Sequence, residues 1–298
     1  MTERKTHLDT VAVASLLLCC ALWGLNQVAA KVALAEIPPL LQAGARSVVA
    51  ALLVALWARL RGIGLFARDG TGWAGLAAGA LFAAEFACIF IGLQFTTASR
   101  MVVFIYLSPF VVALGMHFIA HNERLHPGQW LGLAAAFSGV AWAFAEGFTQ
   151  PAAGPRQWMG DALGVLAAVL WAATTLVIRA TRLTSAVPEK TLLYQLGISG
   201  ALLGAAGWAA GEHWPAALTP VTWAAFGFQA VIVTFASYLL WFWLVRHYPA
   251  TRLAAFTLLT PIFGLLAGVT LLGEPLTLRL MVALIAVTGG IALVNRRA

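Results

Sequence analysis

Charge is the scarcest property of this 298-residue chain: 10% of its residues are charged, 61% are hydrophobic, and the mean hydropathy is +0.88. Soluble domains contain about 25% charged and about 45–50% apolar residues. A soluble globular domain is therefore excluded, and so is a disordered chain, which is rich in polar residues. The composition predicts a protein that crosses a membrane several times.

Cysteine is also scarce, and its placement excludes two kinds of site. Cys19, Cys20 and Cys88 lie in apolar segments, without a C-x-x-C pattern and without a nearby histidine. We expect them to be small buried side chains, so no disulfide and no metal site is predicted. The net charge of +7 comes from basic residues that stand singly in short loops, which excludes a nucleic-acid partner. No cofactor-binding motif is present.

Long apolar segments follow one another along the chain, separated by proline, glycine or charged residues. At about 20 residues for each spanning helix, they provide ten predicted helices. Apolar residues cover most of the circumference of each segment, whereas a β-barrel would alternate in its polarity. The predicted spans are residues 11–34, 40–60, 73–94, 100–119, 128–145, 158–178, 191–210, 221–245, 250–272 and 277–295.

Basic residues alternate between the two sides of this topology. With the N-terminus on the cytoplasmic side, thirteen Lys and Arg residues fall on that side of the membrane. Three others, Arg100, Arg156 and Arg279, fall on the other side. Because positively charged loops stay in the cytoplasm, we expect both termini to be cytoplasmic.

The first and second halves of the chain resemble each other in sequence. Leu22 to Lys31 aligns with Leu170 to Arg179 at an offset of 148, and Ala98 to Pro109 aligns with Ala250 to Pro261 at an offset of 152. A tryptophan, a basic residue, an arginine and a proline recur in the same order. These matches indicate an internal duplication.

The duplication divides the chain into two five-helix repeats. The first covers residues 1–148, an extracytoplasmic linker covers 149–157, and the second repeat covers 158–298. Because five is an odd number of spans, the second repeat enters the membrane with the opposite orientation. We therefore predict an all-α membrane protein of ten transmembrane helices arranged as two inverted five-helix repeats, an architecture of secondary transporters.

Several segments resemble the drug/metabolite transporter superfamily, specifically its EamA-type members. In the first half these are Ala21 to Asn26, Tyr106 to Pro109 and Asn122 to Leu125. In the second half, Thr260-Pro261 followed by Gly273 to Leu276 repeats the pattern. Within the superfamily the chain is most similar to bacterial aromatic amino acid exporters. The resemblance implies a transporter in the bacterial cytoplasmic (inner) membrane.

Seven residues within the predicted spans are candidates for substrate binding. Trp23 and Trp171 are equivalent in the repeat, so their rings are expected to approach the central axis from the two halves and to stack on an apolar substrate, or to pack against other helices. Polar side chains among the seven offer hydrogen bonds to a zwitterion. The seven are Trp23, Asn26, Gln42, Glu85, Tyr106, Trp171 and Tyr238.

Charged side chains inside spans are costly, at about 2.5–3.5 kcal/mol each, so each one needs a reason. Lys31, Arg46 and Glu85 form the predicted intramembrane charge network, in which Glu85 reaches Arg46 more easily than Lys31. Three roles for Glu85 stay open: a structural ion pair, an anchor for a substrate's polar group, and a proton-coupling carboxylate. Pro109 and Pro261 lie within the fourth and ninth spans, where each would bend its helix as a hinge or as a static kink.

Sequence and resemblance together predict a secondary transporter that exports small organic metabolites, namely aromatic or large neutral amino acids, by alternating access around a midplane cavity. Its expected partners are a small-molecule substrate and the lipid bilayer, and the chain is a monomer or a weak homodimer. A passive channel or a lipid scramblase is the first alternative class. An intramembrane serine hydrolase is the second, because Gly197 to Gly200 reads G-I-S-G, with Ser199 as nucleophile and His117 as the available histidine.

Overall fold

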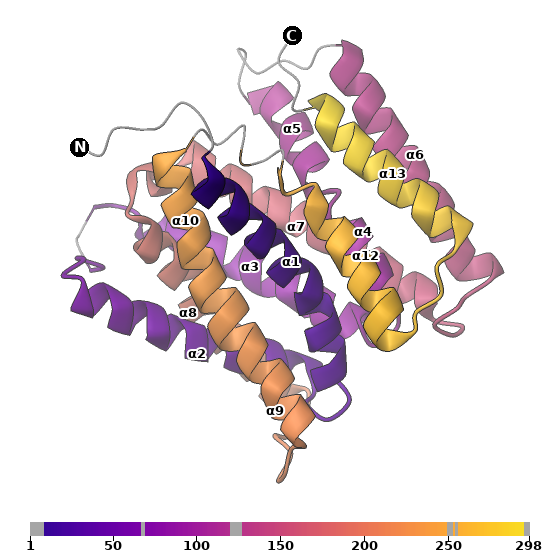
Figure 1. The fold of residues 1–298 in the computed structure, drawn as a ribbon. Coiled ribbons are helices and arrows are strands. Elements are labelled where there is room, and N and C mark those ends of the chain that lie inside the picture. The colour runs from indigo at the N-terminus through magenta and orange to yellow at the C-terminus, as the bar shows by residue number, and fades with distance from the viewer. Residues whose placement is uncertain (1–8, 67–68, 120–126, 249–252, 254–255, 295–298) are drawn as a thin grey trace.

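The computed structural model describes residues 9–66, 69–119, 127–248, 253 and 256–294, and these residues contain helices and no strand (Figure 1). Six uninterrupted helices are long and apolar enough to cross a membrane. They are α1 (Thr10–Ala33), α2 (Pro39–Leu60), α3 (Gly72–Gly92), α6 (Pro127–Thr149), α7 (Gln157–Ala180) and α8 (Pro188–Ala209).

Two further spans are composite. Helices α4 (Ala98–Ile105) and α5 (Ser108–Ile119) follow each other in one span. The other joins α9 (Pro220–Gly227), the π-helical segment η2 (Phe228–Ser237) and α10 (Tyr238–His247). A π-helix is rare and is commonly found at functional sites.

Two shorter apolar helices, α12 (Leu259–Leu272) and α13 (Leu278–Val294), follow in the sequence, and a short 3₁₀ turn, η1 (Arg182–Ser185), joins α7 to α8. The all-helical membrane class is confirmed, and the eight long spans begin and end within a few residues of their predicted limits. Much of 250–258 and the 122–125 motif lie outside the described residues. The count of ten helices therefore stays a prediction.

Local sequence explains where the helices begin and end. The side chains of Thr97 and Thr219 accept a hydrogen bond from the first turn of α4 and of α9, which is the usual role of a threonine N-cap. Proline occupies the first position of α2, α8 and α9, where its missing N–H has no helical partner in any case. Gly273 ends α12 with a positive φ of 65°, a conformation that glycine adopts without strain.

The two candidate hinge prolines stand near the starts of helices, each directly after a break in its span. The fourth span breaks at Tyr106 and Leu107, and Pro109 is the second residue of α5. Pro261 is the third residue of α12, directly after a turn at Thr257 and Leu258. Because a proline ring clashes with the carbonyl four residues earlier, the helix ends before the proline. A bending motion at these two breaks stays a prediction.

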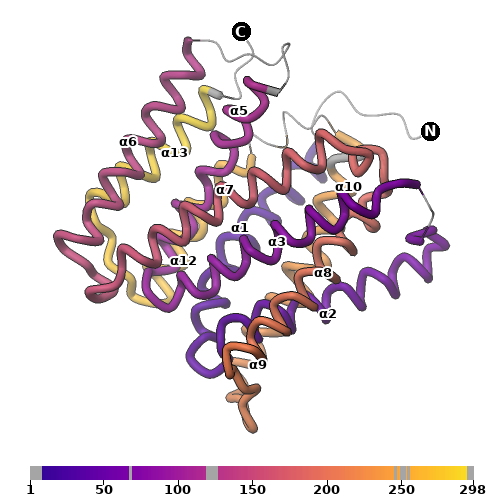
Figure 2. The backbone as a smooth tube through the Cα atoms, turned by 180° about the vertical axis from the view of Figure 1, so that it is seen from behind, coloured from indigo at the N-terminus to yellow at the C-terminus, as the bar shows by residue number. Residues whose placement is uncertain are grey.

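Helices of the first half pack mostly on helices of the second half. Helix α2 lies along α8, α3 along α7 and α8, α1 along α12, and α6 along α13 at one edge of the molecule (Figures 1 and 2). Glycines allow the closest approaches: a Cβ at Gly24 would lie 2.6 Å from the backbone nitrogen of Gly264, and one at Gly132 would lie 2.8 Å from the carbonyl oxygen of Gly290. Small residues at crossings are the usual means by which membrane helices pack tightly.

Helix α1 begins and α13 ends at the same end of the bundle, which we call the terminal face (Figure 1). The opposite face is the end at which α1 ends and α13 begins. Helices α7 and α8 meet at the terminal face through η1, and α3 ends at the opposite face. The positions of the cavity and of the contacts between helices are given below relative to these two faces.

Candidate functional site

A cavity of about 450 Å³ lies inside the bundle. Its walls come from both halves: α1, α3 and α4 on one side, and α7, α8, η2, α10 and α12 on the other. Leu183, Thr184 and Ala186 also line it, and they belong to the connection between α7 and α8 at the terminal face. The cavity therefore extends from the middle of the bundle towards the terminal face.

The structure brings six of the seven candidate substrate residues to this cavity. All six line its wall, although they come from five different helices or turns of the chain. They are Trp23, Asn26, Glu85, Tyr106, Trp171 and Tyr238.

Aromatic rings from the two halves meet in pairs on the cavity wall. Tyr106 of the first half stands edge to face with Trp171 of the second, at a centroid distance of 5.7 Å. Trp23 of the first half meets Tyr238 at 6.4 Å and Trp241 at 5.3 Å. These edge-to-face distances are in the favourable range for aromatic pairs. The Trp23 indole also donates a 2.8 Å hydrogen bond to the Ser237 hydroxyl, which fixes its orientation.

Glu85 is the acidic side chain of the cavity. It lies in α3, is 5% exposed, and its Oε2 is buried without a hydrogen-bond partner. Arg46 is completely buried, but the structure gives it no ion pair with Glu85. Its guanidinium lies 4.0 Å from the centre of the Phe86 ring and donates to Thr234 of η2. The Glu85 side chain thus lies on the cavity wall without a hydrogen bond, within the electrostatic range of Arg46.

Gln42 and Lys31 are not brought to the cavity. The Gln42 amide donates to the carbonyl of Ala30 and to the Gln229 side chain, so it joins α1, α2 and η2 in the closed part of the bundle. Lys31 does not approach Glu85, because its ammonium donates to the carbonyls of Leu93 and Thr96 beyond the end of α3. It therefore ties the end of α1 to the end of α3 at the opposite face.

A buried charge cluster lies outside the set of residues that the sequence singled out. Arg100 is 3% exposed, and its guanidinium contacts Glu146 and Asp161 at 2.7 Å each. Asp161 also accepts a 2.6 Å hydrogen bond from Thr96. The cluster joins α4 and α6 of the first half to α7 of the second. The sequence placed Arg100 among the loop charges of the outer side.

The start of α4 is held by a carboxylate of the other half. Glu274, after α12, accepts hydrogen bonds from the backbone N–H of Ala98 at 2.7 Å, and from the backbone N–H and the hydroxyl of Ser99 at 2.8 and 2.6 Å. A carboxylate at a helix N-terminus is stabilised by the unpaired N–H groups and the helix dipole. Together with the Arg100 cluster, these three hydrogen bonds of Glu274 link the two halves of the chain at the opposite face.

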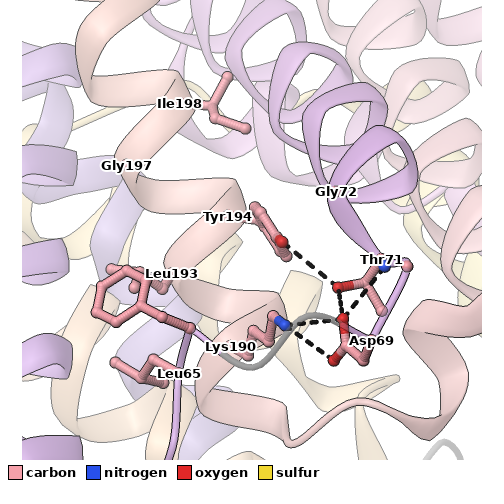
Figure 3. Close-up of a pocket in the computed structure, with 11 residues that line it drawn as sticks. Leu65, Asp69, Thr71, Gly72, Lys190, Leu193, Tyr194, Gly197 and Ile198 are labelled. Carbon is pink, nitrogen blue, oxygen red and sulfur yellow. Dashed lines mark hydrogen bonds and ion pairs between the residues drawn. The ribbon is translucent and has the colours of Figure 1, made fainter.

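Two loops reach across to the first turn of a helix in the other half. Asp69, between α2 and α3, accepts two 2.8 Å hydrogen bonds from the Lys190 ammonium at the start of α8 (Figure 3). Glu212, after α8, accepts hydrogen bonds from the backbone N–H groups of Leu40 and Leu41 at the start of α2. The first link lies at the terminal face and the second at the opposite face.

The Asp69 link borders a second, shallow pocket of about 560 Å³ between α3 and α8 (Figure 3). The Lys190 ammonium and the Thr71 hydroxyl hold the pKa of Asp69 well below its usual range. Likewise, the backbone N–H and hydroxyl of Thr219 lower the pKa of Glu36. Both carboxylates are therefore ionised at neutral pH, and these links weaken only in acid.

Ser199 lacks the setting of a nucleophile. It is completely buried in α8, and its hydroxyl donates to the carbonyl of Leu196 in the preceding turn. His117 lies in α5, where its ring packs against Trp130. The described residues also contain no group of three or more His, Cys, Asp or Glu that could hold a metal ion.

The long apolar helices surround an internal cavity with aromatic walls, which is the architecture of a multi-span membrane transporter. The chain belongs to the EamA-like transporter family, whose model matches residues 10–145 and again residues 158–296. The family predicted from the sequence is confirmed.

Similar proteins agree with this class. The chain is 28% identical to an uncharacterized transporter of Bacillus subtilis over 93% of its own length and 88% of the relative. It is 26% identical to an Escherichia coli protein named "probable amino-acid metabolite efflux pump", over 92% of this chain and 91% of that protein. One solved structure, 18% identical, superposes with a TM-score of 0.64 over 96% of this chain and 98% of its own, which shows the shared fold.

Proposed function

We propose that this protein exports aromatic or other large neutral amino acids, or closely related small metabolites, by alternating access around the internal cavity. The observation that carries the proposal is the cavity itself. It is enclosed by both halves, it has aromatic walls, and it holds one carboxylate. The efflux-pump name of the Escherichia coli relative supports the direction and the class of substrate.

An inverted repeat supplies the symmetry that such a mechanism needs. Helices α2 and α8 are equivalent in the repeat, and each receives at its first turn a carboxylate from the other half, at opposite faces. The pairing of α1 with α12 has its counterpart in the packing of α7 against α4 and α5. Two equivalent halves with opposite orientations have two equivalent ways of closing, one for each face.

The contacts of this structure support a state that is closed at the opposite face. There, Lys31 ties α1 to α3, Glu274 holds α4, and Glu36 accepts hydrogen bonds from Thr219 at 2.7 and 2.8 Å. At the terminal face, Ile178 near the end of α7 and Leu183 and Thr184 of η1 line the cavity wall. Because the positive-inside rule places the terminal face in the cytoplasm, this state would load substrate from inside the cell.

Counterflow in proteoliposomes tests the proposed function. Vesicles are loaded with unlabelled phenylalanine, tryptophan, methionine or threonine, and labelled amino acid is added outside. We expect saturable exchange that is fastest with the aromatic pair, because the aromatic walls favour large rings. Flux that rises without saturation would indicate a channel or scramblase, and exchange of none of these amino acids would contradict the proposed substrate class.

Replacement of the indole of Trp23 is expected to weaken binding of the bulky substrates selectively. In Trp23→Ala the cavity loses one aromatic wall, so we expect KM for tryptophan exchange to rise about 10-fold, the scale of one aromatic contact. In the matched Trp23→Phe variant, which keeps a ring and loses the bond to Ser237, most of the affinity should remain. An aggregated Trp23→Ala protein on size-exclusion chromatography would instead assign the side chain to helix packing.

A further inference from the structure

The wall of the internal cavity carries charge of one sign. Among the described residues that line it, Glu85 is the one charged side chain, and the others are aromatic, aliphatic or neutral polar. Two buried cations lie behind or beyond this wall. Arg46 stacks on the Phe86 ring, donates to Thr234 and interacts electrostatically with Glu85, while its Nε and Nη2 atoms have no partner. Lys31 donates to backbone carbonyls at the opposite face. A ligand in the cavity therefore contacts the Glu85 side chain directly and contacts no cationic side chain on the wall.

Buried oxygen atoms on the same wall lack hydrogen-bond donors. Besides Oε2 of Glu85, the side-chain oxygens of Asn26 and Gln27 have no partner. All three residues line the cavity, and they come from α1 and α3. Buried polar groups in proteins are nearly always paired, so a group of unpaired acceptors at a cavity calls for a ligand that carries several N–H donors.

The aromatic rings on the cavity wall also favour a cationic ligand. Trp23, Tyr106, Trp171, Tyr238 and Trp241 all line the cavity. Their π-faces attract cations, and the attraction grows where water is excluded. An ammonium group with three donors matches both the rings and the acceptor oxygens, whereas a ligand carboxylate would meet no cationic side chain on the wall.

We infer that the cavity recognises the ammonium group of its substrate through Glu85 and takes aromatic primary amines that lack a carboxylate at least as readily as the corresponding amino acids. The inference rests on the proposed function, since it assigns the substrate class of the same cavity. The α-carboxylate of an amino acid then adds nothing to binding. The substrate class is an aryl-alkyl ammonium ion, with or without an ester or amide in place of the acid.

A matched ligand series tests this directly on the full-length protein in nanodiscs, by calorimetry or tryptophan fluorescence. The four probes are phenethylamine, phenylalanine methyl ester, phenylalanine and 3-phenylpropionate. We expect the amine and the ester to bind at least as tightly as phenylalanine, and 3-phenylpropionate to bind at least about 10-fold more weakly than phenethylamine. Equal binding of phenylpropionate and phenethylamine, or no binding of phenethylamine, would overturn the inference.

The Glu85→Gln variant keeps the shape of the side chain and removes its charge. We expect phenethylamine affinity to fall about 10- to 100-fold, the range for one hydrogen bond to a charged group, with Glu85→Asp recovering part of it. The matched control is Glu189→Gln, in the first turn of α8 and outside the cavity wall, which should bind as the wild type does. A Glu85→Gln protein that binds phenethylamine normally would overturn the inference.

The two proposals fail separately. If phenylalanine exchanges in proteoliposomes while the wild type does not bind phenethylamine, the proposed export of amino acids is supported and the inferred recognition of the ammonium group is contradicted. If phenethylamine binds and exchanges while no amino acid does, ammonium recognition stands and the amino-acid substrate class falls.

Discussion

We expect transport to stop, completely and reversibly, when the ends of α1 and α3 are joined at the opposite face by a covalent cross-link. The bridge is built from Lys31→Cys and Leu93→Cys, in a chain whose three native cysteines are replaced, with a short bis-methanethiosulfonate reagent. The Lys31 ammonium donates a 3.2 Å hydrogen bond to the carbonyl of Leu93, so in this state the two positions lie about one lysine side chain apart, within reach of a short linker. If these ends must separate for the opposite face to open, the bridged protein is confined to one state. Reductant should restore counterflow.

The matched control is a bridge at the terminal face, between Asp69→Cys and Lys190→Cys. These side chains already touch at 2.8 Å, and α3 and α8 pack directly beneath them, since a Cβ at Gly75 would lie 2.5 Å from the Tyr194 ring. The equivalent link between Glu212 and the start of α2 is present at the opposite face, which is the closed one. Because one structure holds both links, at a closed face and at an open one, we expect the contact between α3 and α8 to stay the same when a face closes. The control cross-link should therefore leave counterflow intact. Inhibition by both bridges alike would contradict the assignment of the gate.

Loss of the Arg100 guanidinium is expected to cost the protein about 3–5 kcal/mol of stability, which is the scale for breaking a buried ion pair. In Arg100→Met, the carboxylates of Glu146 and Asp161 stay buried within one cluster and lose their shared cation. The measurement is the fraction of monodisperse protein after heating, compared with wild type. A matched arginine is available in Arg279, which is only partly buried and donates to Thr149 from the same face of the molecule. Arg279→Met should change stability by less than about 1 kcal/mol.

A triple variant separates the effect of buried charge from the effect of packing in that cluster. If buried charge is the cause, Arg100→Met combined with Glu146→Gln and Asp161→Asn should recover part of the lost stability, because the uncompensated carboxylates are gone. If Arg100→Met and Arg279→Met lower the stability of the protein equally, the burial of the Arg100 cluster does not contribute to stability.

Sequence patterns predicted the helices and the aromatic wall well, because both depend on local or repeated signals. Proline and glycine mark the span ends, and hydropathy marks the spans. Trp23 and Trp171 were found through the repeat, which predicts that equivalent residues approach the centre from both halves. Trp241 was missed, although it lies three residues after Tyr238 and so shares its helix face.

Charges inside the bundle were harder to place, because their partners are distant in the sequence. Arg100 is 46 positions from Glu146 and 61 from Asp161, and single charges near span ends look like loop charges. Depth in the membrane suggested that Glu85 lies near Arg46, and the two side chains interact electrostatically without forming an ion pair. Depth does not specify the direction of a side chain, and the Arg46 guanidinium lies over the Phe86 ring, where the widened turn of η2 presents Thr234 to it.

The central claim is that one cavity is reached in turn from the two faces of the membrane, and accessibility of Thr175 measures it most directly. Thr175 lines the cavity on α7. A Thr175→Cys side chain is added to the chain that carries cysteines at 31 and 93, and a membrane-impermeant maleimide is applied from the opposite face. The account predicts labelling before the bridge is formed, protection while it is in place, and labelling again after it is reduced and the reductant removed. Labelling from the opposite face through an intact bridge would contradict it.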